Sequence, residues 1–146
     1  MHKTPWLILY FKYKRSWPCI YYYFLINQGL MTAFVFPGQG SQFVGMAKDF
    51  YDNFSVARRI FEEIQDYVKL DLKEIIFENK ENLINITNYT QISIFAASVS
   101  IFKTYQEVSD LQINDINFML GHSLGEYSAL ACSQKLSLKS CSEILK

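Results

Sequence analysis

The feature that most constrains the fold is a GxSxG turn at residues 121–125, placed between a short apolar run and a helical pattern. Residues 116–120 predict a strand that ends at the turn, and residues 124–132 predict a helix that begins directly after it. A second apolar run at residues 32–36 stops at Pro-Gly and predicts another buried strand. Strands without polar alternation are typical of parallel sheets covered by helices.

Helical patterns fill the interval between the two predicted strands. Apolar residues recur at helical spacing in one segment, at Ala57, Phe61, Ile64 and Val68. Residues 91–102 contain no charge and predict a helix that is buried on most sides. Residues 72–77 predict a short helical piece, and residues 81–88 a polar connection. The order predicts an α/β fold in which a partial parallel sheet is wrapped by helices.

Composition limits the class of protein. The 146 residues suit one domain, and 14 basic against 14 acidic residues leave no basic field for nucleic acid. The three cysteines, Cys19, Cys132 and Cys141, form no CxxC or Cys/His cluster, which argues against a disulfide framework and a metal site. We therefore expect a folded protein of the reducing cytoplasm that binds no nucleic acid and no metal.

The first 30 residues differ from the rest of the chain. They contain four bases, no acid and nine aromatic residues. Bases and Pro18 interrupt their apolar runs, so they predict no stable membrane insertion. A signal peptide or an interfacial anchor stays an alternative. We favour the interpretation that residues 1–30 are a non-homologous leader and that Met31 is the natural start. Whether the leader is translated is then itself in question, and the domain comprises residues 31–146.

The GxSxG turn predicts a nucleophile elbow with Ser123 as the nucleophile. In such an elbow Gly121 and Gly125 let neighbouring backbone pass closely, so that the serine hydroxyl is lifted clear of the sheet. The helix dipole and the Leu124 N–H then face the reacting carbonyl and stabilise an oxyanion. A chance match in a small-residue turn is the alternative that the strand and helix on either side disfavour.

A second glycine-rich turn, at residues 37–42, follows the first predicted strand. In a parallel sheet it lies at the same edge as the GxSxG turn, so Gln39 and Ser123 are expected to meet there. The Gln39 N–H is a candidate for a second oxyanion donor, because Gly38 and Gly40 permit a close approach. Taken alone, this turn is more often only a connection.

Taken together, three motifs resemble malonyl-CoA:acyl carrier protein transacylases and the acyltransferase domains of fatty-acid and polyketide synthases. The motifs are FVFPGQGSQ at 34–42, Thr-Gln at 90–91 and GHSLGEYSAL at 121–130. The resemblance implies that Ser123 is acylated by malonyl-CoA and passes the malonyl group to the phosphopantetheine thiol of acyl carrier protein, in fatty-acid synthesis, with no bound cofactor. It also implies that Gln39 and Leu124 supply the oxyanion amides, and that Gln91 lines the substrate site.

The same resemblance implies residues that this sequence does not supply. A serine needs an adjacent base, and the sequence has only His2 and His122. As the chain neighbour of Ser123, His122 is expected to support the elbow. The family's catalytic histidine, its malonyl-binding arginine and its inserted ferredoxin-like subdomain lie downstream of the matched region. We therefore expect the amino-terminal part of a transacylase, truncated or split.

Two alternatives stay open. A noncatalytic remnant, or a half-protein that needs a separately encoded carboxy-terminal partner in trans, is favoured by the missing histidine. An α/β-hydrolase esterase is disfavoured, because no HGGG-type loop and no downstream Asp and His accompany the elbow.

Overall fold

The computed structural model describes residues 23–26 and 29–146, so most of the predicted leader lies outside the described residues. The strands are β1 (Tyr23–Ile26), β2 (Gly29–Phe36) and β3 (Phe118–Gly121). The α-helices are α1 (Lys48–Asn53), α2 (Ser55–Val68), α3 (Thr87–Ser109), α4 (Gly125–Cys132) and α5 (Leu138–Leu145). Shorter helical pieces are the π-helix η1 (Glu74–Glu78) and the 3-10 helices η2 (Leu83–Asn85) and η3 (Ile113–Asp115).

The described sheet has the strand order β1-β2-β3 and is mixed. β2 and β3 are parallel, with Ala33 opposite Phe118 and Phe36 opposite Gly121, which confirms the predicted parallel pair. β1 is antiparallel to β2 and adds a strand that the sequence analysis did not predict. Only two residues separate these strands in the chain, and a connection that short joins antiparallel neighbours. The domain boundary at residue 30 stays a prediction.

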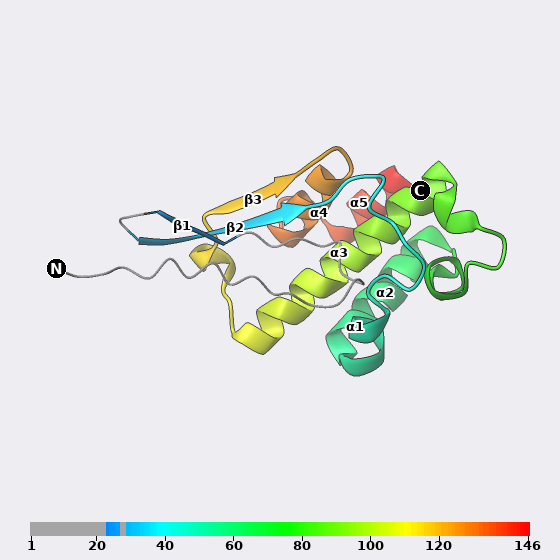
Figure 1. The fold of residues 1–146 in the computed structure, drawn as a ribbon, viewed down its shortest axis with the longest axis horizontal. Helices are drawn as coiled ribbons and strands as arrows, with labels where there is room; N and C mark the ends of the chain where they lie inside the picture. The colour runs from blue at the N-terminus through cyan, green and yellow to red at the C-terminus, as the bar shows by residue number, and fades with distance from the viewer. Residues whose placement is uncertain (1–22, 27–28) are drawn as a thin grey trace.

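α3 forms the centre of the helical layer. In Figure 1 it crosses the molecule between the strands and the pair α1 and α2. Every residue from Ile92 to Phe102 is buried, which confirms a helix enclosed on most sides. The Phe102 ring meets the Phe34 ring of β2 edge-on at 5.0 Å and the Phe36 ring at 5.8 Å. Aromatic contacts of this kind fix α3 against the sheet.

The amphipathic pattern at residues 57–68 is confirmed as α2. Its four predicted apolar positions are all buried, and α2 packs on α3. The predicted helical piece at residues 72–77 is also helical, although its last turns are the π-helix η1.

The predicted polar connection at residues 81–88 is wrong at its end, because α3 already begins at Thr87. Side-chain hydrogen bonds order this segment: Asn79 Oδ1 accepts from the Ile84 N–H at 3.1 Å, and Thr90 Oγ1 donates to the Ile84 carbonyl at 2.6 Å. α3 also runs seven residues past Phe102. Apolar periodicity identifies only the buried part of a helix, so the sequence prediction of residues 91–102 left out both ends of α3.

Two helices carry no prediction from the sequence, α1 and α5. α5 begins at the cap Ser137, whose Oγ accepts from the Ser140 N–H at 2.9 Å. α1 is only six residues long and follows Ala47, which has a φ of 59°. Both are too short for periodicity to separate a helix from a turn.

Helices cover one face of the β2–β3 pair within the described part of the chain. Phe34 and Phe36 point into the helical layer and are buried, and α4 packs on both strands. Side chains alternate along a strand, so Val35, Phe118 and Leu120 point the other way. Phe118 is 50% exposed and Leu120 is 53% exposed. The described residues therefore leave one face of this strand pair without a covering layer.

Candidate active site

Ser123 occupies the turn between β3 and α4, as the motif predicts. Its φ is 55°, in the left-handed region that residues with a side chain rarely adopt. The side chain is exposed, and no hydrogen bond to its Oγ comes from residues 23–26 or 29–146. A strained backbone that holds an accessible hydroxyl at a strand end has the geometry of a nucleophile elbow.

Gly121 and Gly125 make this turn possible. A Cβ on Gly121 would collide with the backbone of Gly125 and Glu126, and a Cβ on Gly125 would collide with the carbonyl oxygen of Phe36. The close approach brings the first turn of α4 against the end of β2. Glycine is therefore required at both positions by contact with neighbouring backbone, as the sequence predicts.

His122 joins the two strand ends. The backbone N–H of His122 donates to the Phe36 carbonyl at 3.3 Å, and the His122 carbonyl accepts from the Gly125 N–H at 3.0 Å. A Cβ on Gly38 would lie 2.5 Å from the His122 carbonyl oxygen and 2.9 Å from Nδ1. Within the described part of the chain, no hydrogen bond links the imidazole to Ser123. The backbone of His122 therefore connects the end of β2 to the start of α4.

The same contacts bring the turn after β2 beside the elbow. Because Gly38 touches His122, the next residues in each turn, Gln39 and Ser123, lie at the same edge of the sheet. Among the described residues, neither the Gln39 N–H nor the Leu124 N–H donates a hydrogen bond. N–H groups without an acceptor can stabilise a developing oxyanion when they face it.

The amino-terminal end of α3 also reaches this site. Gln39 Nε2 lies 3.5 Å from Thr87 Oγ1, at the start of α3. Gln91 follows Thr87 by four residues and so shares its helix face. Gln91 is half-buried. The sequence predicted Gln91 for the site but missed Thr87, because it fell in a segment expected to be a connection.

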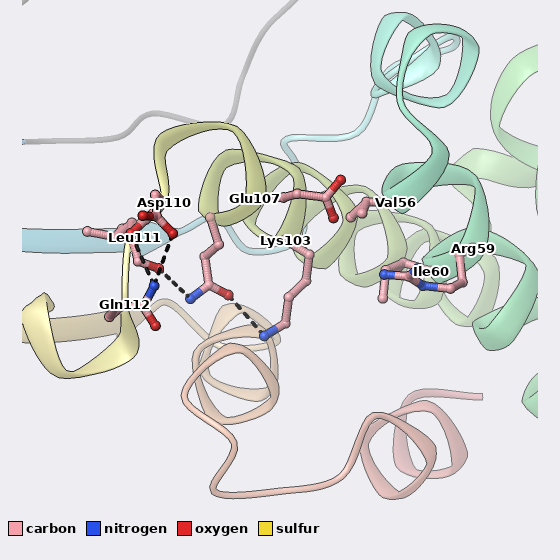
Figure 2. A pocket seen from close by; sticks show the side chains of 9 residues that line it. Val56, Arg59, Ile60, Lys103, Glu107, Asp110, Leu111 and Gln112 are labelled. Atoms are coloured by element: carbon pink, nitrogen blue, oxygen red, sulfur yellow. Dashed lines mark hydrogen bonds between the residues drawn. The ribbon is translucent and has the colours of Figure 1, made fainter.

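A cavity of about 420 Å³ lies elsewhere, between α2 and the carboxy-terminal end of α3. Figure 2 shows charged side chains from both helices around it, including Arg59, Lys103 and Glu107. The Lys103 ammonium donates to Gln106 Oε1 at 3.0 Å. This cavity contains none of the predicted site residues, and it lies at the other end of α3 from Gln91.

The described residues include no group of three or more His, Cys, Asp or Glu side chains that could hold a metal ion. No helix among them is both long and apolar enough to cross a membrane.

Comparisons with known proteins agree with this geometry. Residues 33–143 match the acyl transferase domain family. A malonyl CoA-acyl carrier protein transacylase from Bacillus subtilis is 40% identical over 114 residues, which are 78% of this chain and 28% of the relative. The corresponding protein from Haemophilus influenzae is 35% identical over 114 residues, 78% of this chain and 36% of that relative.

Solved structures give the same result. An acyl-carrier-protein S-malonyltransferase from Bartonella henselae superposes with a TM-score of 0.73 at 37% identity, covering 77% of this chain and 36% of that one. A malonyl-transacylase in complex with its type II PKS acyl-carrier protein superposes with a TM-score of 0.71 at 39% identity, covering 77% and 36%. The chain thus spans about a third of the length of the relatives that it matches. It belongs to the acyl transferase domain family, in the group of the malonyl-CoA:acyl carrier protein transacylases.

Proposed function

We propose that this chain contributes the nucleophile and the oxyanion donors for malonyl transfer from coenzyme A to acyl carrier protein in fatty-acid synthesis. The observation that carries the proposal is the left-handed backbone of the exposed Ser123, at a sheet edge that it shares with Gln39. The N–H groups of Gln39 and Leu124 donate to no described residue, which supports their proposed role. The choice of malonyl as the acyl group and of acyl carrier protein as the acceptor follows the relatives, which are malonyl CoA-acyl carrier protein transacylases. One similar structure contains a malonyl-transacylase in complex with an acyl-carrier protein. We place the reaction in the cytoplasm, with malonyl-CoA as a substrate and no bound cofactor.

In the first half-reaction, Ser123 Oγ attacks the thioester carbonyl of malonyl-CoA and loses its proton to a base. The Gln39 and Leu124 N–H groups stabilise the tetrahedral oxyanion, an effect worth roughly 3 kcal/mol for one donor. Collapse breaks the C–S bond, and the coenzyme A sulfur takes the proton from the base. In the second half-reaction the phosphopantetheine thiol attacks the acyl-serine, and Ser123 recovers its proton.

These steps need a base, and no described residue is assigned to that role. This gives a reason for a second candidate function. The sequence has two histidines, and His122 forms no hydrogen bond with Ser123 in the described part of the chain. The second candidate is a half-protein that acts only with a separately encoded carboxy-terminal partner, or a noncatalytic remnant. The half-protein is favoured by the exposed apolar face of the sheet, where Phe118 and Leu120 are each about half exposed.

Mixing the chain with the remaining part of the Bacillus subtilis transacylase tests both candidates. We expect the mixture to transfer malonyl groups to acyl carrier protein, and intact-mass measurement to find one malonyl group on this chain. Ser123→Ala should abolish both signals, because no other nucleophile sits in the elbow. Ser109→Ala, at an exposed serine on the last turn of α3, is the matched control and should leave both unchanged.

The possible results separate the candidates. Transfer that survives Ser123→Ala would overturn the proposed mechanism. Transfer by the chain alone would exclude the need for a partner. A folded mixture that never carries a malonyl group would support the noncatalytic remnant.

A further inference from the structure

We propose that Gln42 is a positioning residue for the oxyanion amide of Gln39. The inference rests on the proposed function and adds a residue to it. Gln42 Oε1 accepts a hydrogen bond from the Gly40 N–H at 2.8 Å, inside the turn that follows β2. The Gln42 side chain therefore binds the backbone immediately after Gln39.

The turn has a second side-chain clamp on the other side of Gln39. Ser41 Oγ donates to the Gly38 carbonyl at 2.8 Å, and the Ser41 N–H lies 3.4 Å from the same oxygen. The Gly38 carbonyl and the Gly40 N–H thus both form hydrogen bonds within the turn. The Gln39 N–H between them donates to no described residue, so it is left available for the substrate.

This turn depends on side chains because no regular element holds it. Gly40 has a φ of 103°, which glycine tolerates, and the turn has no strand or helix hydrogen bonds of its own. Gln42 Nε2 also lies 3.5 Å from Asn85 Oδ1, and Asn85 Nδ2 donates to Asn82 Oδ1 at 2.7 Å. Gln42 therefore connects the turn to the ordered segment that precedes α3.

The consequence for catalysis is specific. An oxyanion donor is effective only when it lies close to 3 Å from the charge that develops, so a small displacement weakens it. If the Gly40 N–H loses its acceptor, we expect the backbone of the turn to shift and to move the Gln39 N–H away from the oxyanion. We expect malonyl-CoA binding to be little affected, because this bond lies within the turn itself. We expect the loss to lower kcat by about 10-fold to 100-fold and to leave KM within about two-fold.

The test compares three variants of the full chain, mixed with the remaining part of the Bacillus subtilis transacylase. Gln42→Leu removes the acceptor while keeping most of the side-chain volume. Gln42→Glu keeps an oxygen for the Gly40 N–H and removes the Nε2 donor to Asn85. Gln65→Leu is the matched control, because Gln65 Oε1 accepts from a backbone N–H, that of Leu72 at 3.2 Å, in a turn far along the chain.

Two readouts are taken for each variant: kcat and KM for malonyl transfer, and hydrogen exchange at the Gly40 amide of the isolated chain. We expect Gln42→Leu to lower kcat and speed Gly40 exchange, Gln42→Glu to recover kcat to within about five-fold and restore slow exchange, and Gln65→Leu to change neither. An unaltered kcat in Gln42→Leu, with an active wild type, would overturn the role of Gln42 alone. A wild-type mixture without any transfer would instead overturn the proposed function on which this role rests.

Discussion

At the scale of single residues, the site is defined by backbone contacts that admit no side chain. Gly121, Gly125 and Gly38 each lie where an added Cβ would collide with nearby backbone atoms. These contacts bring the ends of β2 and β3 together and leave Ser123 exposed between them. The three glycines therefore position Ser123 through backbone contacts.

Gly125→Ala is expected to lower the free energy of unfolding by about 1–3 kcal/mol, since the methyl group has to displace the Phe36 carbonyl from the start of α4. Urea unfolding followed by circular dichroism measures this loss. Gly45→Ala is the control: its φ of 83° is strained, but a Cβ there meets nothing within 4 Å. A loss at Gly125 no larger than the loss at Gly45 would contradict the steric argument.

The two described cysteines give a second prediction at this scale. Cys132 and Cys141 are both buried, and burial raises the pKa of both thiols above the ordinary value. A raised pKa keeps each thiol protonated at pH 8, and the thiolate is the reactive form. In a Cys19→Ser chain, a thiol reagent at pH 8 should label neither cysteine until denaturant is added, as mass spectrometry would detect. Rapid labelling of Cys132 in the folded protein would contradict the packing of α4 against α3.

At the scale of elements, the parallel pair β2–β3 and the helix α3 form the unit that positions the site. Phe34 and Phe36 from β2 meet Phe102 from α3, and these contacts lie beyond the part of β2 that pairs with β1. The β1–β2 register ends at Thr32, two residues before the first buried phenylalanine. β1 is therefore peripheral to the aromatic contacts between β2 and α3.

A chain that begins at Met31 is expected to melt cooperatively and within about 5 °C of the full chain. The physical reason is that β1 pairs with β2 only up to Thr32, so its removal leaves the contacts of Phe34 and Phe36 in place. Thermal unfolding of both chains by circular dichroism is the measurement. A broad, noncooperative transition in the shorter chain would show that residues 1–30 stabilise the domain.

At the scale of the whole molecule, the described part has one well-packed helical layer and one open sheet face. Val35, Phe118 and Leu120 lie on that face, and the last two are about half exposed. A contiguous apolar surface of this kind is a place where chains associate or a partner binds. The open face favours the half-protein that we propose as the second candidate function.

The isolated chain is expected to bind a hydrophobic dye at neutral pH and to elute from size-exclusion chromatography as more than a monomer. Phe118→Thr with Leu120→Thr should reduce both signals, because threonine retains strand propensity without the exposed apolar area. Val108→Thr is the control, since Val108 is 69% exposed at the end of α3, away from this face. A compact monomer that binds no dye would show that the open face is covered in solution.

The sequence by itself determined the elements whose residues repeat with a clear period or stand in a motif. The helices at residues 57–68 and 91–102 were predicted correctly because burial imposes an apolar pattern on them. The strand at residues 32–36 was predicted from an apolar run that stops at Pro-Gly. The elbow was predicted from the glycines and serine of residues 121–125, because only small residues fit so tight a turn. The position of Gln39 and Ser123 at the same edge of the sheet followed from the rule that parallel strands end at one edge.

Only the tertiary structure decided the rest. The start of α3 at Thr87 depends on side-chain hydrogen bonds from Asn79 and Thr90, which leave no apolar period in the sequence. The pairing of β1 with β2 depends on backbone groups, which every sequence shares. The exposure of Leu120 depends on which elements lie beside its strand, and a leucine in a covered strand has the same sequence as one in an exposed strand. Only the tertiary structure therefore shows that this face is open.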